Sequence, residues 1–569
     1  MIRIGLIDVL DQLNSDDREH LGLASIAAYL RRHNIAVDLL SFVTGECSEA
    51  PSPVTLPQYD LYGFSLYPNT ADEVTKYANA IKAIYPDSLV CVGGQLATAA
   101  ACEILDDCSS IDFCVLGDGE DPLLRVVQAM ASRQSLHLIP AILTRTSPAR
   151  TVVISRTELD ELSWPVRDFL PLSAKRGNRT ARLNSSLGCV ASCTFCSVNG
   201  YYEAELTARQ SAPSRQLLVH GLPNGTSGQE PQRRKKWRAR RMQDVFDEIL
   251  WLNRNFGVRS FVFNDASFED PGIIGKNRIK ELCKLIKDCG TILALRCSMR
   301  AESLTHEDNC LLELMRSVGF THIFVGIEAG NDSDLRVFNK RASVEDNERT
   351  IALLERNDID LTMGFIMLNP YSTWSTVADN YRFLAKHRAF ILSQYIGKVH
   401  VYFGTALHER LRTDRLLTSD FSYRKPFAYL FVDRKVRELD DFLEELRDNP
   451  LMDKQSGKMY TLSYTVSELR ALFGSQADWA VEEFRELRLR SAAVLASYFA
   501  GPLEEGDLSR ARKGLEHFNA AVAGVCEELN SFSLKLVYNR TFRDYLLRYK
   551  RPATANASRS TPLVSYNTP

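Results

Sequence analysis

The stretch "GCVASCTFCS", residues 188–197, brings Cys189, Cys193 and Cys196 together, whereas the other ten cysteines are scattered singly. Thiolates are soft ligands that suit zinc and iron–sulfur clusters. Structural zinc needs four closed ligands, usually in paired sets, and no second pair stands nearby. Three thiols can instead hold three irons of a [4Fe–4S] cluster and leave the fourth iron open. Zinc with a remote ligand such as His220, or three unrelated thiols, stay as alternatives.

Residues 1–135, upstream of the cysteines, alternate short apolar runs with amphipathic helical segments. This alternation predicts an α/β domain with a parallel sheet wrapped by helices. Ligands of such sheets bind beyond the carboxyl ends of the strands, where Gly93, Gly94, Gly117 and Gly119 fall. The predicted strands are 2–10, 36–42, 59–67, 89–94 and 111–119, and the predicted helices are 22–34, 71–85 and 120–132.

A proline-containing linker, 136–180, leads to a second alternating series, 181–405. This series predicts a complete or partial α/β barrel, in which chemistry gathers at the carboxyl ends of the strands. Its strand-like segments are 259–267, 291–299, 321–330, 360–368 and 397–404. We expect the following strand-end residues to line one mouth: Asn264, Asp265, Ser298, Arg300, Glu328 and Asn369.

A polar insertion at about 200–240 is predicted to form a long loop over this mouth. Residues 406–551 carry apolar residues at helical spacing and predict a mainly helical domain, and residues 552–569 read as a disordered tail.

The formal net charge of -2 gives no bulk reason to expect nucleic-acid or membrane partners. No signal peptide or spanning helix is recognised, so we expect a cytoplasmic protein. The basic run "RRKKWRARR", residues 233–241, is interpreted as a solvated loop or a clamp on phosphates rather than an RNA site, with Trp237 packing the loop onto the barrel.

The chain resembles the cobalamin-binding radical S-adenosylmethionine enzymes, the methyltransferase-like class B. "CVASCTFC" matches their CxxxCxxC signature, including the aromatic residue before the third cysteine. "FVFNDASF", "GIEAG", "VFNK" and "GFIMLNPYST" resemble later barrel segments, and "GTALHERLRTDRLL" resembles the segment that closes the barrel. "YDLYGFSLYPNT", "VCVGGQLAT" and "VLGDGEDPLLRVV" are similar to the cobalamin-binding domain that precedes it, a Rossmann-like fold at residues 1–135.

The resemblance implies that Cys189, Cys193 and Cys196 bind a [4Fe–4S] cluster whose fourth iron is chelated by S-adenosylmethionine. It implies that Asp265, with Asn264, accepts hydrogen bonds from the methionyl ammonium. Glu328 is implied to contact the ribose or the amino acid end of S-adenosylmethionine, and Arg300 its carboxylate. The other residues implied at this site are Phe195, Ser298 and Asn369.

Cobalamin is the third implied cofactor. The DxHxxG motif that supplies a histidine to cobalt in classical domains does not occur here. His20 is interpreted as a helix-start histidine at least as readily as a cobalt ligand. The residues implied to contact cobalamin are Ser65, Leu66, Tyr67, Asn69, Gly93, Gly94, Gln95, Gly117, Asp118, Gly119 and Glu120.

The resemblance implies C-methylation of an unactivated carbon in specialised-metabolite biosynthesis, through a 5′-deoxyadenosyl radical and methylcobalamin. Its implied partners are a small-molecule substrate and an electron donor such as a flavodoxin or ferredoxin. Radical cyclisation or rearrangement, with or without cobalamin, is one alternative. A zinc- or RNA-binding protein that uses the cysteines and the basic run is another.

Overall fold

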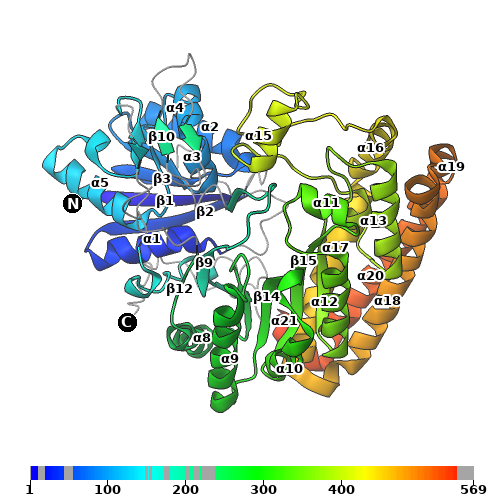
Figure 1. Ribbon diagram of the computed structural model, residues 1–569. Coiled ribbons are helices and arrows are strands. Elements are labelled where there is room, and N and C mark those ends of the chain that lie inside the picture. The colour runs from blue at the N-terminus through cyan, green and yellow to red at the C-terminus, as the bar shows by residue number, and fades with distance from the viewer. Residues whose placement is uncertain are drawn as a thin grey trace, which may run out of the picture.

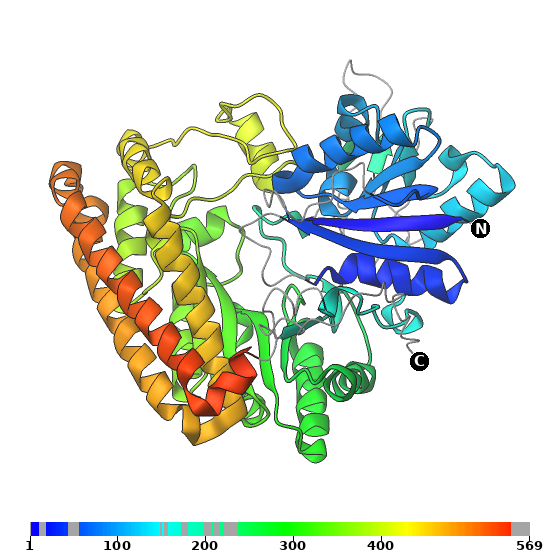
Figure 2. The same cartoon turned by 180° about the vertical axis from the view of Figure 1, so that it is seen from behind.

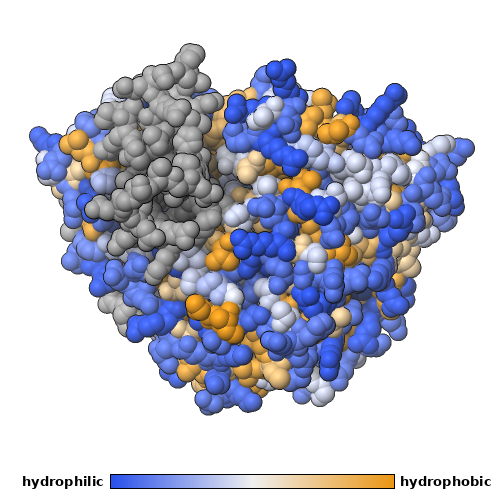
Figure 3. Space-filling model, viewed as in Figure 1, coloured by the Kyte–Doolittle hydropathy of each residue, from blue (hydrophilic) through white to orange (hydrophobic). Residues whose placement is uncertain are grey.

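The chain forms two α/β units and a long helical bundle (Figure 1). In the computed structural model, the described residues are 2–10, 19–43, 56–147, 151–152, 157–171, 180–198, 206–208, 217–219 and 237–547. Among these residues, none of the helices has the length and apolar character needed to cross a bilayer. The face seen in Figure 3 is largely hydrophilic, with apolar residues in small groups.

The N-terminal unit is a six-stranded sheet in the order β2-β1-β3-β4-β5-β6, parallel except for the antiparallel edge strand β6. Apolar residues of the sheet pack against α1 and α5 on one face and against α2 and α4 on the other. The strands are β1 Arg3–Leu10, β2 Ala36–Val43, β3 Leu61–Ser65, β4 Leu89–Gly93, β5 Phe113–Val115 and β6 Ile142–Thr144. The helices are α1 Leu21–Arg32, α2 Ala71–Ile84, α3 Gln95–Ala99, α4 Ala101–Asp107 and α5 Glu120–Ser132.

The second unit is an open, parallel five-stranded sheet in the order β8-β13-β14-β15-β16, so the barrel is partial. Apolar residues of the strands and of the surrounding helices form its core. The strands are β8 Thr180–Leu183, β13 Ser260–Phe263, β14 Ala294–Arg300, β15 Phe320–Glu328 and β16 Asp360–Phe365. The helices of this unit are α8 Met242–Phe256, α9 Gly272–Cys289, α10 Asn309–Ser317, α11 Asp332–Val337, α12 Val344–Arg356, α13 Trp374–Lys386 and α14 Ser393–Ile396.

The C-terminal helices form a bundle beside the second sheet (Figure 2). Helix α17 contacts β14, β15 and β16, and the Thr321 hydroxyl donates to the Ser467 carbonyl at 2.8 Å. The bundle therefore covers part of the open sheet, a contact that the sequence analysis did not predict. Its members are α16 Arg434–Arg447, α17 Pro450–Phe473, α18 Asp478–Phe499, α19 Leu508–Lys513, α20 Leu515–Tyr538 and α21 Arg540–Leu547. Helix α15 Ala406–Thr413 lies apart from the bundle, beside the N-terminal unit (Figure 1), and packs with residues of α11.

The structure differs from the expected elements in four places. Residues 397–404 form no strand, because they make only isolated bridges, Lys398 to Leu368 and Val401 to Phe427. Strand β8, strand β6 and the helices at 95–107 were not predicted, since each is short or follows directly on a neighbouring element.

Among the described residues, five short strands lie outside the two sheets. Strand β9 Ser186–Gly188 pairs with β12 Trp237–Ala239, and β10 Leu206–Ala208 lies between β7 Thr151–Val152 and β11 Leu217–Val219. Most of the insertion and the whole of the tail, 552–569, lie outside the described residues, as does His220.

Candidate active site

A cavity of about 540 Å³ lies at the carboxyl edge of the N-terminal sheet. Leu6, Gly63 and Cys91 contribute wall from β1, β3 and β4. The residues predicted for cobalamin that line the cavity are Ser65, Tyr67, Gly93, Gly94, Gln95, Gly117, Asp118, Gly119 and Glu120. Leu66 is instead packed in the core at 2% exposure, and Asn69 is not on the wall, so their role in cobalamin binding stays a prediction.

Glycines keep side chains out of this cavity. Gly94 has φ +98° and ψ −173°, a conformation essentially restricted to glycine. A Cβ on Gly119 would lie 2.6 Å from Ile26 Cδ1, and one on Gly63 would lie 2.8 Å from Leu6 Cδ2. Bare backbone at the rim and apolar side chains on the wall fit a large ligand with polar edges, as cobalamin is.

His20 lines the cavity and also caps α1. Its Nδ1 accepts a hydrogen bond from the Leu23 amide at 3.1 Å, which in a neutral imidazole places the ring proton on Nε2. Nε2 lies 3.2 Å from the Tyr67 hydroxyl. A protonated Nε2 has no lone pair for cobalt, so the arrangement favours the helix-start role for His20.

Glu120 is a buried carboxyl group on the cavity wall. Burial raises its pKa to about 7, the charge of Asp118 acts in the same direction, and a 2.7 Å hydrogen bond from Ser25 Oγ opposes them. Asp118 itself forms a 2.8 Å ion pair with Arg238 of β12. The glycine-flanked loop of Asp118 is therefore attached to the second unit.

The cysteine loop follows β9 and is anchored through Thr194. The Thr194 amide and hydroxyl donate to the carbonyls of Phe338 and Val337, each at 2.9 Å, and its carbonyl accepts from the Leu407 amide at 2.8 Å. The ring of Phe195 packs edge-on against Phe338, with centroids 5.3 Å apart. The loop is thus held against the end of α11 and the start of α15.

All three thiols of the loop are partly buried. Burial raises the pKa of Cys189 to about 12 and that of Cys193 to about 11, so without metal these thiols keep their protons and metal binding releases them. Among the described residues, no three His, Cys, Asp or Glu side chains are grouped so as to hold a single metal ion. A [4Fe–4S] cluster has no such requirement, because each thiolate binds a different iron.

Asp265 is buried where β13 ends. Its carboxylate accepts from the Ser185 amide at 2.9 Å and from the hydroxyls of Ser185 and Ser186, each at 2.5 Å. These bonds fix the corner between β8 and β9, directly before the cysteine loop. Asn264 is exposed on the cavity side, where its Oδ1 accepts from Arg182 at 2.8 Å. The proposed contacts of both residues with the methionyl ammonium stay predictions.

Arg300, at the end of β14, is surrounded by carboxylates. It pairs with Asp270, with Glu302 at 3.0 Å and with Glu269 at 3.6 Å. Asp270 also accepts from the Val190 amide at 3.2 Å, next to Cys189. Arg300 therefore supports the cysteine loop, and a further contact with the S-adenosylmethionine carboxylate stays a prediction.

The remaining predicted residues differ in surroundings. Glu328 ends β15 and pairs with Lys340 at 3.5 Å. Ser298 accepts from the Phe268 amide through its carbonyl at 2.9 Å. Asn369 is fully buried, and its amide donates to Asp334 at 2.8 Å. Contacts of these residues with S-adenosylmethionine stay predictions.

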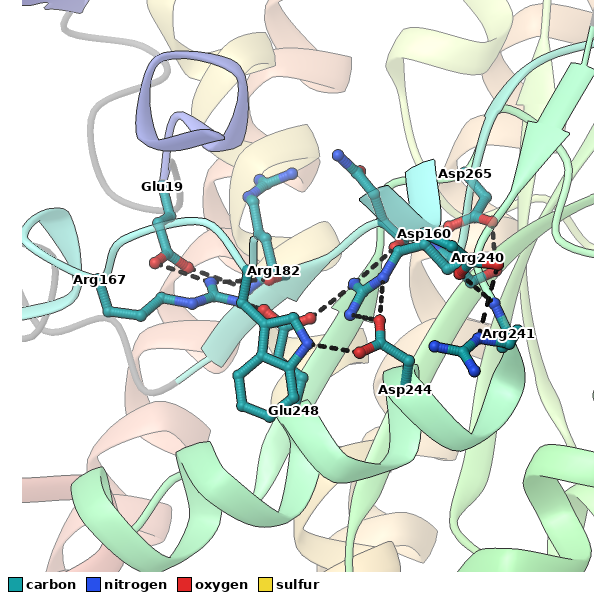
Figure 4. Close-up of polar contacts among 12 residues, drawn as sticks. Glu19, Asp160, Arg167, Arg182, Arg240, Arg241, Asp244, Glu248 and Asp265 are labelled. Atoms are coloured by element: carbon teal, nitrogen blue, oxygen red, sulfur yellow. Dashed lines mark hydrogen bonds and ion pairs between the residues drawn. The ribbon is translucent and has the colours of Figure 1, made fainter. Parts of the chain in front are cut away.

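A buried ionic network joins the two units (Figure 4). Arg167, 2% exposed, pairs with Glu19 at 2.9 Å and with Glu248 at 2.5 Å. Arg240 pairs with Glu248 and with Asp244, each at 2.6 Å. Glu19 lies beside the cavity, whereas Glu248 and Asp244 belong to α8, so charge pairing fixes the cavity against the barrel.

The described end of the basic run belongs to this joint, which corrects its interpretation as a solvated loop or phosphate clamp. Arg238 pairs with Asp118, Arg240 with α8, and Arg241 with Asp160 at 3.6 Å. Trp237 lies under the Arg278 guanidinium, 5.2 Å from the ring centroid. Arg238 and Arg240 are buried beside the β12–β9 pair, whereas the Arg241 side chain is 75% exposed.

The cysteine loop and the cavity are adjacent. Ser197 Oγ donates to Gln95 on the cavity wall at 3.0 Å, and Arg182, Asn184 and Asn264 of the barrel line the same cavity. Sequence reasoning missed Glu19, Arg167, Glu248 and Lys340. The sequence signal for these residues was a charged residue within an apolar pattern. Such a pattern suggests a buried charge but does not identify the residue that pairs with it.

Two family models match the chain. Residues 15–127 match the B12 binding domain, and residues 183–384 match the Radical SAM superfamily. The matches confirm the resemblance and the expected fold class.

Among curated proteins, the anaerobic magnesium-protoporphyrin IX monomethyl ester cyclase of Rubrivivax gelatinosus is 26% identical over 63% of this chain and 60% of its own length. The hopanoid C-3 methylase of Methylococcus capsulatus is 22% identical over 61% of each chain. The chain thus spans about 60% of the length of these relatives. The solved structure of the cobalamin-dependent S-adenosylmethionine radical enzyme OxsB with aqua-cobalamin bound shares the fold, with a TM-score of 0.66 and 16% identity over 96% of this chain and 84% of that one. This chain belongs to the cobalamin-binding radical S-adenosylmethionine enzymes, whose cofactors are a [4Fe–4S] cluster, S-adenosylmethionine and cobalamin.

Proposed function

We propose that the protein methylates an unactivated carbon of a small-molecule substrate in specialised metabolism. When bound, the cluster with S-adenosylmethionine supplies a hydrogen-abstracting radical, and cobalamin supplies a methyl group. The observation that carries the proposal is the adjacency of the two sites through the 3.0 Å contact between Ser197 and Gln95. A methyl donor and a radical-generating cluster must face one substrate for this reaction.

The chain's own residues hold the sites in place. The Cys189, Cys193 and Cys196 thiolates bind the cluster, and the loops at 93–95 and 117–120 hold the corrin. The joint around Arg167 sets the separation of the two sites, because its pairs are almost completely buried. Fixed positioning of reactants is a large part of catalysis by such sites.

The C-terminal bundle packs against the starts of β14, β15 and β16, at the opposite end of the sheet from the strand ends where chemistry gathers. The His322 ring on β15 lies 2.9 Å from Thr362 Oγ1 and 3.4 Å from Ser467 Oγ, and Arg296 lies over the ring of Tyr464. Helix α17 therefore contributes polar and aromatic side chains beside the sheet. A one-electron donor such as a flavodoxin or ferredoxin completes the proposed system.

Oxidative cyclisation is the second candidate, and a relative named as a cyclase favours it. The two reactions differ in the fate of the methyl group. Methylation consumes a second S-adenosylmethionine and releases S-adenosylhomocysteine, whereas cyclisation moves no methyl group.

The test is anaerobic turnover of protein reconstituted with iron, sulfide and hydroxocobalamin, with a chemical reductant and a panel of candidate substrates. With S-[methyl-²H₃]adenosylmethionine we expect a deuterated methyl group in the product, together with 5′-deoxyadenosine and S-adenosylhomocysteine. A product that lacks the label would refute methylation in favour of cyclisation or rearrangement. Bound zinc without iron or acid-labile sulfide would instead favour the zinc-protein alternative.

A further inference from the structure

We propose that Lys340 is a positioning residue of the S-adenosylmethionine site, acting through Glu328, with Gly326 leaving the space that their pair needs. The inference rests on the predicted contact between Glu328 and S-adenosylmethionine. It concerns cofactor binding, so it can fail independently of the methylation proposal.

The backbone of Glu328 is in an unusual conformation for its residue type. Its φ is +63°, in the left-handed region that non-glycine residues rarely adopt. The register between β15 and β16 shifts between Gly326 and Glu328, so an irregularity interrupts the pairing at the strand end. Irregularities of this kind re-aim side chains and cluster at functional sites.

Lys340 explains how the re-aimed carboxylate is held. The Lys340 side chain is 3% exposed, and its ammonium lies 3.5 Å from Glu328 Oε1 and donates to the Gly326 carbonyl at 3.1 Å. A buried ammonium is costly unless it is paired and hydrogen-bonded. The pair thus fixes both the carboxylate and the irregular strand end.

Gly326 is required by the pair rather than by its own backbone angle. A Cβ at this position would lie 2.5 Å from Glu328 Oε1 and 3.2 Å from Lys340 Nζ. Its φ is not in the positive range, so alanine would move the pair without straining the backbone at residue 326. Gly326→Ala therefore displaces the Lys340–Glu328 pair without changing any charge, and it serves as a second test variant.

The pair also lies beside the cluster loop. The charges of Lys340 and Glu328 both act on the Cys193 thiol, and Asn339 donates to the Ser192 carbonyl at 2.8 Å. A carboxylate held beside Cys193 is placed to contact a molecule bound at the open iron.

The test compares Lys340→Met, Lys340→Arg and Gly326→Ala with the wild type after anaerobic reconstitution. Lys276→Met is the matched control, because Lys276 of α9 forms a largely buried 2.7 Å pair with Asp308, which precedes α10. The measurements are iron and sulfide content, the affinity for S-adenosylmethionine by equilibrium dialysis, and the electron paramagnetic resonance spectrum of the reduced cluster with and without S-adenosylmethionine.

We expect Lys340→Met and Gly326→Ala to weaken binding about tenfold or more and to reduce the spectral response to S-adenosylmethionine, with partial recovery in Lys340→Arg. In a Glu328→Gln background, Lys340→Met should add little, because it acts through Glu328.

Wild-type affinity and spectra in Lys340→Met would overturn the proposal. If Lys340→Met loses the cluster, Gly326→Ala decides: weakened binding with a full cluster supports the proposal, and normal binding overturns it. A wild-type protein that cannot be loaded with a cluster would instead contradict the family's chemistry for this chain.

Discussion

Replacing Arg167 with methionine tests whether the buried network joins the two units. The substitution removes the 2.9 Å pair with Glu19 and the 2.5 Å pair with Glu248. Glu248 keeps Arg240 at 2.6 Å, whereas among the described residues Glu19 keeps only the Arg182 amide, at 3.2 Å. An orphaned buried carboxylate of this kind costs about 3–5 kcal/mol.

The expected loss can be measured by urea unfolding followed through tryptophan fluorescence. Trp164 donates to Asp244 at 2.8 Å beside the network, so its emission should report the joint. Because a chain of several domains can unfold in steps, hydrogen exchange of peptides covering 19–32, 157–171 and 242–256 should locate the opening. Protection should fall at these three segments first.

Two further variants make the result interpretable. Arg382→Met breaks exposed pairs with Asp379 and Glu504 and should cost only about 0–1 kcal/mol. Adding Glu19→Gln to Arg167→Met removes the orphaned charge and should restore part of the loss. If Arg167→Met is no less stable than Arg382→Met, the network is not the joint.

Three other changes test the cofactor sites and the bundle. Cys193→Ala should abolish bound iron and sulfide while far-ultraviolet circular dichroism is unchanged, and reductive cleavage that persisted would remove Cys193 from the ligand set. Gly94→Ala places a side chain at φ +98°, which costs about 1–3 kcal/mol, so retained cobalamin after desalting should fall while iron is kept; equal cobalt in both proteins would argue against this loop. Burial lowers the pKa of His322 from 6.5 to about 3, so the unfolded chain binds a proton that the native chain does not. Stability should therefore fall as pH drops from about 6.5 toward 3, and less steeply in His322→Asn; parallel stability profiles would refute this assignment.

The sequence by itself determined the features that depend on local spacing. The three cysteines are close enough in sequence to lie on one loop, so their grouping is predicted without any tertiary contact. The glycines at 93–94 and 117–119 are likewise predicted from the ends of two strands alone. The cavity lining that the sequence predicted follows from the rule that parallel strands place their carboxyl ends at one edge.

Only the tertiary structure decided which distant groups meet. Arg167 pairs with Glu19 and Glu248, which the sequence separates widely, because a buried charge is stable only when opposite charges lie against it. The same reason explains why Lys340 finds Glu328. Helical periodicity predicted the bundle, but it could not predict which face of α17 would cover the open sheet. The partner of an apolar face depends on how the shapes of the packed side chains fit together, which the sequence pattern does not show.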